Sequence, residues 1–141
     1  MDNTIRNSAG IIIENNEGKL LLQLRDDKVK KFPNCWVLLG GALEGDETPE
    51  EAVKREIKEE IGIEIENLKY FKNFNYEYIT QSFFYKKMNL DLGKIDLKEG
   101  KEIKFFSKED IGNLSLGFNI REVIDSFLLS QNQGDKIKNA G

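Results

Sequence analysis

The hydrophobic pattern of the chain begins with two short segments rich in β-branched residues and leucine. Residues 9–14 (AGIIIE) and 19–25 (KLLLQLR) have the length and composition of strands. Between them, residues 15–18 (NNEG) carry asparagine and glycine, which tolerate the positive φ of tight turns. The pattern therefore predicts a β-hairpin, followed by a charged loop over residues 26–34 and a short apolar strand over residues 36–39.

The clearest helix is predicted to start after a glycine-bearing loop at residues 40–47. Thr48 and Glu51 have the spacing of a capping box, and Pro49 suits the first helical position. Gly62 supplies a stop signal at the C-terminal end. The apolar residues of this segment recur every four positions and predict one buried stripe, formed by Val53, Ile57 and Ile61.

Beyond this helix the pattern becomes β-branched and aromatic. Residues 63–90 predict two or three antiparallel strands, with breaks near residues 73–75. A polar loop over residues 92–100 precedes another strand at residues 102–106 (EIKFF). Ser107 is then expected to cap a short helical turn.

The C-terminal part predicts one more helix and a tail. Asn119 and Glu122 form a second capping-box pattern for a helix over residues 120–129. The composition of residues 131–141 predicts a disordered tail, which leaves residues 1–130 as one domain without internal repeats. Strands before and after a central helix predict an α/β fold, a sandwich with helices on both faces of a mixed sheet.

Composition narrows the chemistry. The 141 residues suffice for one domain with its own core. The chain has no histidine and a single cysteine, Cys35, which excludes Cys/His zinc sites, internal disulfides and histidine-dependent catalysis. A net charge of −4 offers no basic platform for nucleic acid. No apolar run reaches the roughly 20 residues of a membrane span, and the N-terminus lacks a signal-peptide pattern, so a cytoplasmic protein is expected.

Three glutamates on the predicted helix indicate a metal site. Glu56, Glu59 and Glu60 project into a wedge of about 100° beside the buried stripe, because a helix turns by about 100° per residue. Carboxylates this close repel one another unless a cation joins them. Without histidine or cysteine ligands the expected ion is Mg²⁺, for which Mn²⁺ can substitute. Arg55 can hold Glu59 or Glu47 in place by a bidentate bond. The alternative is a solvated acidic helix face without a ligand.

The spacing of these residues resembles a known family. Gly41, then Glu47 after five residues, then residues 55–63 (REIKEEIGI) after seven more match every fixed position of the Nudix box, G-x5-E-x7-R-E-U-x-E-E-x-G-U with U aliphatic. Flanking features extend the resemblance along most of the chain, among them Trp36 before the double glycine and the segment at residues 99–106. The layout is most similar to the small MutT-type nucleotide pyrophosphohydrolases.

The resemblance implies a Nudix-type α/β/α sandwich that hydrolyses a nucleoside diphosphate linked to another group X. For a (deoxy)nucleoside triphosphate, the substrate most in keeping with the layout, the products would be a nucleoside monophosphate and pyrophosphate. Hydrolysis of nucleotide sugars or dinucleoside polyphosphates is an alternative, and so is a non-catalytic nucleotide-sensing module. An RNA-decapping enzyme is disfavoured by the negative net charge. The expected partner is a small-molecule nucleotide, and a homodimer is left open.

The resemblance also assigns roles to individual residues. Arg55 would orient the site, with Glu47 supporting it. The general base is left open between Glu56 and Glu102, since a carboxylate must serve where histidine is absent. The metal ligands would be Glu56, Glu59, Glu60 and the carbonyl of Gly40.

Two further residues match family positions that contact substrate. Arg25 would meet a phosphate group, with a surface ion pair as the alternative. Asn119 would contact the base, although its place before the last helix is also explained by capping. One departure is Leu39, where the family commonly has proline; this places loop geometry or substrate fit in question rather than metal binding.

Overall fold

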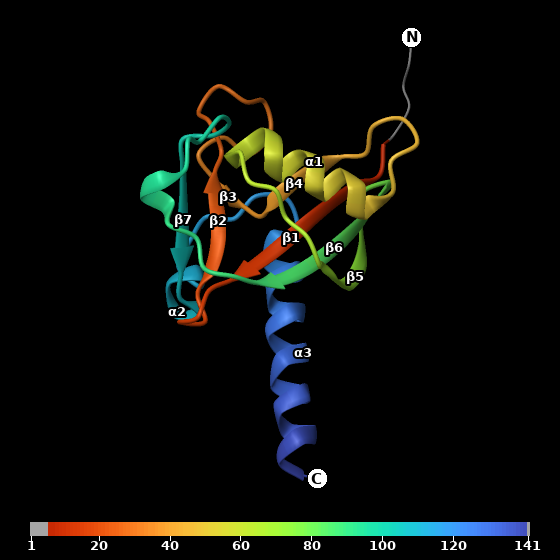
Figure 1. Cartoon of the computed structure of the whole chain (residues 1–141), viewed down its shortest axis with the longest axis vertical. Coiled ribbons are helices and arrows are strands. Elements are labelled where there is room, and N and C mark those ends of the chain that lie inside the picture. The colour runs from red at the N-terminus through yellow and green to blue at the C-terminus, as the bar shows by residue number, and fades with distance from the viewer. Residues whose placement is uncertain (1–5, 141) are drawn as a thin grey trace.

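The computed structural model describes the backbone of residues 6–140 and the side chains of residues 6–132. The strands are β1 (Ser8–Glu14), β2 (Leu20–Leu24), β3 (Trp36–Val37), β4 (Leu39–Ala42), β5 (Lys69–Tyr76), β6 (Ile79–Lys87) and β7 (Glu102–Phe106). The helices are α1 (Pro49–Ile61), the 3₁₀ helix η1 (Leu92–Lys94), α2 (Lys108–Ile111) and α3 (Ile120–Ala140). All seven strands join one mixed sheet, with α1 on one face and α3 on the other (Figure 1). The predicted α/β sandwich is confirmed.

Strand β1 explains where the core lies. It pairs antiparallel with β2 and β4 and parallel with β6. Successive side chains of a strand point to opposite faces, so Ile11 and Ile13 join the cluster under α1 whereas Ile12 joins the cluster under α3. Both faces of β1 are therefore buried, which accounts for its nearly unbroken apolar sequence.

Helix α1 begins and ends as the sequence predicts. Both hydrogen bonds of the capping box between Thr48 and Glu51 are present, and Gly62 ends the helix in the left-handed conformation at φ 71°. The predicted apolar stripe is buried, and Glu60 is buried beside it. A carboxyl group is thus held at the margin of the core.

The glycine-rich segment after Trp36 departs from its expected form. The predicted strand at residues 36–39 is divided into β3 and β4, and β4 extends through Gly40 and Gly41. Gly40 has φ 148° and lies opposite Gly10 of β1, where a Cβ would collide with the Ala9 carbonyl oxygen. Glycine therefore lets β4 continue against β1, and the loop begins later than expected.

The break predicted near residues 73–75 is wrong. Asn73 and Asn75 pair with Ser82 and Thr80 in an uninterrupted part of the β5–β6 ladder. The chain reverses instead after Tyr76, where Glu77 adopts φ 56°. Cross-strand pairing and the burial of the neighbouring Phe74 outweigh the local turn preference of asparagine.

Helix α3 is longer than the expected residues 120–129. Its N-terminal half packs on the sheet through Val123, Ile124 and Phe127, and its backbone stays helical to Ala140 through residues assigned to the predicted tail. The boundary of the domain at residue 130 stays a prediction. Ser107 caps α2 as expected. No helix in the described part of the chain is long and apolar enough to cross a membrane.

Candidate active site

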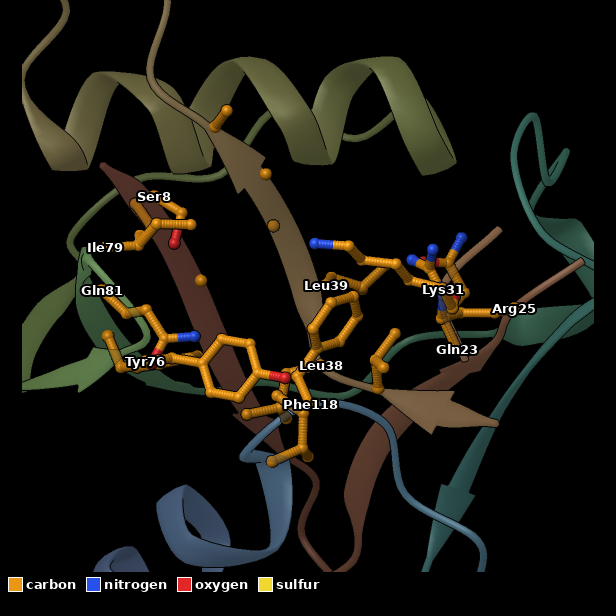
Figure 2. Close-up of a pocket in the computed structure, with 18 of the residues that line it drawn as sticks. Ser8, Gln23, Arg25, Lys31, Leu38, Leu39, Tyr76, Ile79, Gln81 and Phe118 are labelled. Atoms are coloured by element: carbon orange, nitrogen blue, oxygen red, sulfur yellow. The ribbon is translucent and has the colours of Figure 1, made fainter. Parts of the chain in front are cut away.

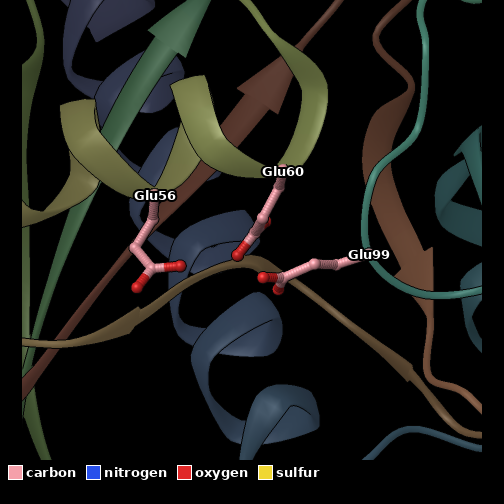
Figure 3. Close-up of side chains that lie close together, drawn as sticks. All are labelled: Glu56, Glu60 and Glu99. Carbon is pink, nitrogen blue, oxygen red and sulfur yellow. The ribbon is translucent and has the colours of Figure 1, made fainter.

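Three carboxylates from two parts of the chain meet at the C-terminal half of α1. Glu56 and Glu60 lie one helical turn apart, and Glu99 reaches them from the loop before β7 (Figure 3). One oxygen from each side chain lies within 4.8 Å of the other two. We call these three residues the carboxylate cluster.

Glu60 is the buried member of the carboxylate cluster. It is 2% exposed, and its Oε2 has no hydrogen-bond partner among the described residues. Burial, followed by the neighbouring Glu56 and the charge of Glu99, raises the pKa of Glu60 to about 9. An orphaned buried oxygen beside two further carboxylates fits a divalent cation, because hard oxygen ligands of this kind hold Mg²⁺, Mn²⁺ or Ca²⁺.

Arg55 connects the cluster to the loop before α1. Its Nε and Nη2 donate to the two carboxylate oxygens of Glu47 at 2.6 and 2.9 Å, which is the bidentate contact expected from the sequence. Its Nη1 donates to Glu56 Oε1 at 3.0 Å and to Glu59 Oε2 at 3.2 Å. The guanidinium lowers the pKa of Glu47 by hydrogen bonding, so this carboxylate stays ionised and fixes the arginine.

The absence of a side chain at Gly41 determines how Glu56 lies. A Cβ at this position would be 2.5 Å from the Glu56 carboxylate carbon. The carboxylate therefore rests directly against the backbone of β4, between that strand and Arg55. This gives the first glycine of the Nudix box a steric role in this chain.

Glu99, and not the predicted general-base candidate Glu102, joins the carboxylate cluster. Glu102 is exposed at the start of β7, opposite Leu24, and is not part of the carboxylate cluster. The loop carrying Glu99 is tied down on both sides: Gln23 Nε2 donates to the Glu99 carbonyl at 2.7 Å, and Lys98 N donates to the Glu60 carbonyl at 2.9 Å.

A signal for Glu99 was present in the sequence. Glu99 precedes Gly100. This glycine adopts φ 80°, and a Cβ there would have no room beside the Leu24 carbonyl oxygen. A glycine required for close packing marks a loop held against the sheet, whereas Glu102 already belongs to the EIKFF strand.

Two other predicted ligands lie around the carboxylate cluster. The Glu59 side chain is 51% exposed and is bound to Arg55 at the rim. Gly40 lines the pocket described next, together with Glu60. Their roles as ligands stay predictions.

A cavity of about 300 Å³ opens beside the carboxylate cluster. Glu60 and Glu99 form its acidic end, and its other walls come from β1, β4, the β5–β6 hairpin and the segment before α3 (Figure 2). Tyr76 and Phe118 line it and contact each other edge to face, with ring centroids 5.8 Å apart. An aromatic wall next to an acidic end suits a ligand with a flat ring and a charged tail.

The Asn119 side chain is paired with Gln81, and no capping contact from it is found within the described residues 6–132. Its Nδ2 donates to Gln81 Oε1 at 2.6 Å, and its Oδ1 accepts from Gln81 Nε2 at 3.0 Å. Gln81 lines the cavity and is nearly buried, so Asn119 fixes a second amide that faces the ligand space. Gln81 was missed because an isolated glutamine in a strand has no local signature.

Within the part of the chain that the structure describes, Arg25 does not form the surface ion pair that is its alternative role. Its Nε donates to the Lys31 carbonyl at 3.0 Å, and its guanidinium lies over the Phe118 ring, 5.1 Å from the centroid. Arg25 lines the cavity, as a substrate contact would. Leu39 is buried in the core under α1, so the residue that replaces proline serves packing.

Known proteins resemble this chain in sequence and in fold. A family model described as a NUDIX domain matches residues 4–127. An 8-oxo-dGTP diphosphatase of Haemophilus influenzae is 38% identical over 104 residues, covering 72% of this chain and 76% of that protein. A MutT protein of Methanosarcina mazei Go1 has a TM-score of 0.65 and 27% identity, covering 82% of this chain and 87% of that one. The NUDIX domain of Shewanella oneidensis NrtR, solved with ADP ribose, shares the fold with a TM-score of 0.77 at 15% identity, covering 92% and 90%.

Proposed function

The chain belongs to the Nudix family of hydrolases, and from that premise we propose that it hydrolyses a (deoxy)nucleoside triphosphate to the monophosphate and pyrophosphate with the help of Mg²⁺. The observation that carries this proposal is the carboxylate cluster opening directly onto the cavity with an aromatic wall. The relative named as an 8-oxo-dGTP diphosphatase supports a triphosphate as the substrate.

The metal is assigned to the residues that fit it best. Glu56, Glu60 and Glu99 would hold it, with Glu59 and the Gly40 carbonyl as further candidates from the sequence. When bound, Mg²⁺ lowers the pKa of water and neutralises charge on phosphoryl oxygens. The buried Glu60 oxygen, for which the described residues offer no hydrogen-bond partner, is the feature that this assignment explains.

The other residues of the site position the carboxylates or accept a proton. Arg55 is fixed by Glu47 and in turn orients Glu56 toward the carboxylate cluster. Deprotonation of the attacking water falls to Glu99 or Glu56, because Glu102 lies outside the carboxylate cluster. Glu99 is exposed, and its loop is held by Gln23, so it can reach both water and ligand.

The nucleoside end is assigned to the aromatic part of the cavity. Phe118 and Tyr76 supply flat apolar surface, and Gln81 supplies a hydrogen-bonding amide whose orientation Asn119 fixes. In this arrangement Asn119 acts on the base through Gln81, and Arg25, whose guanidinium lies over Phe118, lines the same cavity.

Turnover of a nucleotide panel with and without Mg²⁺ tests the proposal. The panel contains (d)NTPs and their oxidised forms, ADP ribose, nucleotide sugars, dinucleoside polyphosphates and capped RNA, with products identified by mass. We expect Mg²⁺-dependent release of a monophosphate from a triphosphate. Glu60→Gln should reduce kcat/KM by about 10²-fold or more, a size typical of removing one electrostatic group from an active site.

Two controls make the result specific. Glu50→Gln removes the same charge from the same helix but outside the carboxylate cluster, and it should leave turnover unchanged. Loss of folding in Glu60→Gln would contradict the metal assignment, because the change relieves repulsion between carboxylates. Binding of a nucleotide without turnover across the panel would instead favour the sensing module.

A further inference from the structure

Lys31 is a basic side chain in the cavity to which the sequence assigns no role. It lies in the loop of residues 25–35 between β2 and β3, and Figure 2 shows it extending from that loop across the cavity toward Leu39. Its ammonium group takes part in none of the hydrogen bonds or ion pairs found among the described residues. Arg25 and Lys31 are the basic residues among those that line the cavity.

Arg25 is already engaged in shaping the loop. Besides the bond from its Nε to the Lys31 carbonyl, its backbone N–H donates to the Cys35 carbonyl at 2.9 Å, and its own carbonyl accepts from Asn34 N at 3.2 Å. The guanidinium also stacks over Phe118. Arg25 therefore closes the loop at its base and holds the backbone of Lys31.

The loop and the facing segment carry unusual backbone conformations. Phe32, Asn34 and Phe118 adopt φ of 52°, 58° and 50°. The left-handed region costs a residue with a Cβ about 1–2 kcal/mol, so the surrounding contacts must enforce it. The rings of Phe32 and Phe118 meet with centroids 4.7 Å apart. This packing turns Phe32 onto the aromatic wall while its neighbour Lys31 faces the cavity.

We propose that Lys31 binds the phosphate nearest the nucleoside, and that Arg25 is a positioning residue that holds Lys31 in place for this contact. The inference rests on the proposed function. Glu60, Glu77 and Glu99 all line the cavity. Mg²⁺ would neutralise charge at the carboxylate cluster, and the Lys31 ammonium, which has no partner among the described residues, supplies further positive charge for a phosphate chain. Lysine binds phosphate as a point charge.

Substitution of adjacent lysines tests the proposal. Lys31→Met should raise KM for the triphosphate substrate by about 10- to 100-fold, as expected for the loss of a charge-assisted hydrogen bond, with kcat changed by less than about threefold. Inhibition by the nucleoside monophosphate should weaken by the same factor, because the contacted phosphate remains in that product. Both lysines are exposed, but Lys30 is not among the residues that line the cavity, so Lys30→Met removes the same charge and should change neither constant.

A double-mutant cycle tests the role of Arg25. Arg25→Lys retains the charge but loses the Nε bond to the Lys31 carbonyl, so it should raise KM in the same direction as Lys31→Met. Because both changes disrupt the same contact between Lys31 and the phosphate, the KM of the double variant should be no higher than that of Lys31→Met alone. Additive effects would show that Arg25 binds substrate independently and would overturn its positioning role.

The outcomes separate this inference from the proposed function. If the wild-type protein turns over the triphosphate while Lys31→Met has an unchanged KM and monophosphate inhibition, the Lys31 assignment is overturned and the hydrolase remains. Equal effects of Lys30→Met and Lys31→Met would overturn it too, since they would reflect net charge alone. Absence of both binding and turnover in the wild type would overturn the proposed function and with it the inference.

Discussion

Glu60 is the residue of the site at which burial and neighbouring carboxylates disfavour the charged form. Its carboxyl group is buried, lies beside Glu56, and has one oxygen without a partner in the described residues. The pKa of Glu60 is raised from 4.5 to about 9, with burial as the main cause. A group in this state either keeps its proton or binds a cation, so its ionisation and metal binding are linked.

The first prediction concerns the stability of the metal-free protein against pH. Because the folded state keeps the Glu60 proton to a higher pH than the unfolded state does, the free energy of unfolding should fall as pH rises from about 5 to about 9. Below the unfolded-state pKa both states are protonated, and this loss is absent. Urea denaturation in EDTA at pH 5.5, 7.0 and 8.5 measures the slope.

Glu60→Gln isolates the contribution of this residue. The glutamine amide is neutral at every pH tested. The free energy of unfolding of the variant should therefore depend less on pH than that of the wild type, and it should be higher than the wild-type value at pH 8.5. Glu50→Gln, on the same helix outside the carboxylate cluster, should keep the wild-type slope. Equal slopes in the wild type and Glu60→Gln would mean that the folded state does not retain this proton.

The residues of the site differ in how far the sequence predicts them. Glu56, Glu60, Arg55 and Glu47 lie within one box, and helical spacing with one short loop places them together. Glu99 and Gln81 reach the site through tertiary contacts from separate loops and strands, and no local periodicity encodes such contacts. This explains why the sequence does not single out Glu99, three positions from the candidate Glu102.

At the scale of elements, the loop before β7 joins two parts of the site. Lys98 N bonds the last turn of α1 at the Glu60 carbonyl, Lys101 N bonds the Leu24 carbonyl of β2, and Gln23 holds the segment between. The position of Glu99 therefore depends on β2 as much as on its own loop. The nearly buried Gln23 amide is the link with the shortest hydrogen bond, 2.7 Å.

The second prediction tests this link. Gln23→Leu keeps the size and burial of the side chain but removes the donor to the Glu99 carbonyl, so the loop should loosen. We expect metal affinity to fall by about 10-fold, the lower range for residues that support metal ligands, and kcat to fall with it. Calorimetric titration of Mg²⁺ measures the affinity independently of turnover.

A matched glutamine on α3 provides the control. Gln131→Leu removes an amide that donates to Glu14 Oε1 at 3.3 Å, away from the carboxylate cluster, and should leave metal affinity unchanged. If Gln23→Leu binds Mg²⁺ as tightly as the wild type does, the loop holds Glu99 without help from β2.

Elements with strong end signals are the ones that the sequence predicts well. Helix α1 has a capping box, a proline at its start and a glycine at its end, and its observed bounds follow these signals. The β5–β6 hairpin has asparagines inside β5 and reverses at Glu77, which carries no turn signature. Pairing with β6 decides that strand, and pairing partners lie outside any local window.

At the scale of the molecule, one sheet separates two apolar clusters. The cluster under α1 supports the carboxylate cluster, and the cluster under α3 contains Phe106, on which Trp36 packs edge to face with centroids 4.7 Å apart. The order of elements predicts the sandwich. It does not predict that β1 and β6 pair in parallel, which brings distant segments together in the middle of the sheet.

The last prediction is that the two faces unfold as one unit. β1 contributes alternate side chains to both clusters, so the loss of either cluster exposes the other through the same strand. Trp36, the single tryptophan, reports on the cluster under α3, whereas far-UV circular dichroism reports on all elements. Denaturation curves followed by the two signals should coincide. Mg²⁺ at about 100 times its Kd should shift both by about 2.7 kcal/mol, because it binds only the folded state.

Glu60→Gln should greatly reduce this shift in both signals, since it removes a proposed metal ligand, which lies on the opposite side of the sheet to Trp36. A Trp36 curve that stays in place while the dichroism curve moves with Mg²⁺ would contradict cooperative unfolding. It would mean that the α1 layer and the α3 layer separate before the sheet is lost. Coincident shifts would instead show that a cation at one face stabilises side-chain packing on the other, because the buried strand β1 belongs to both.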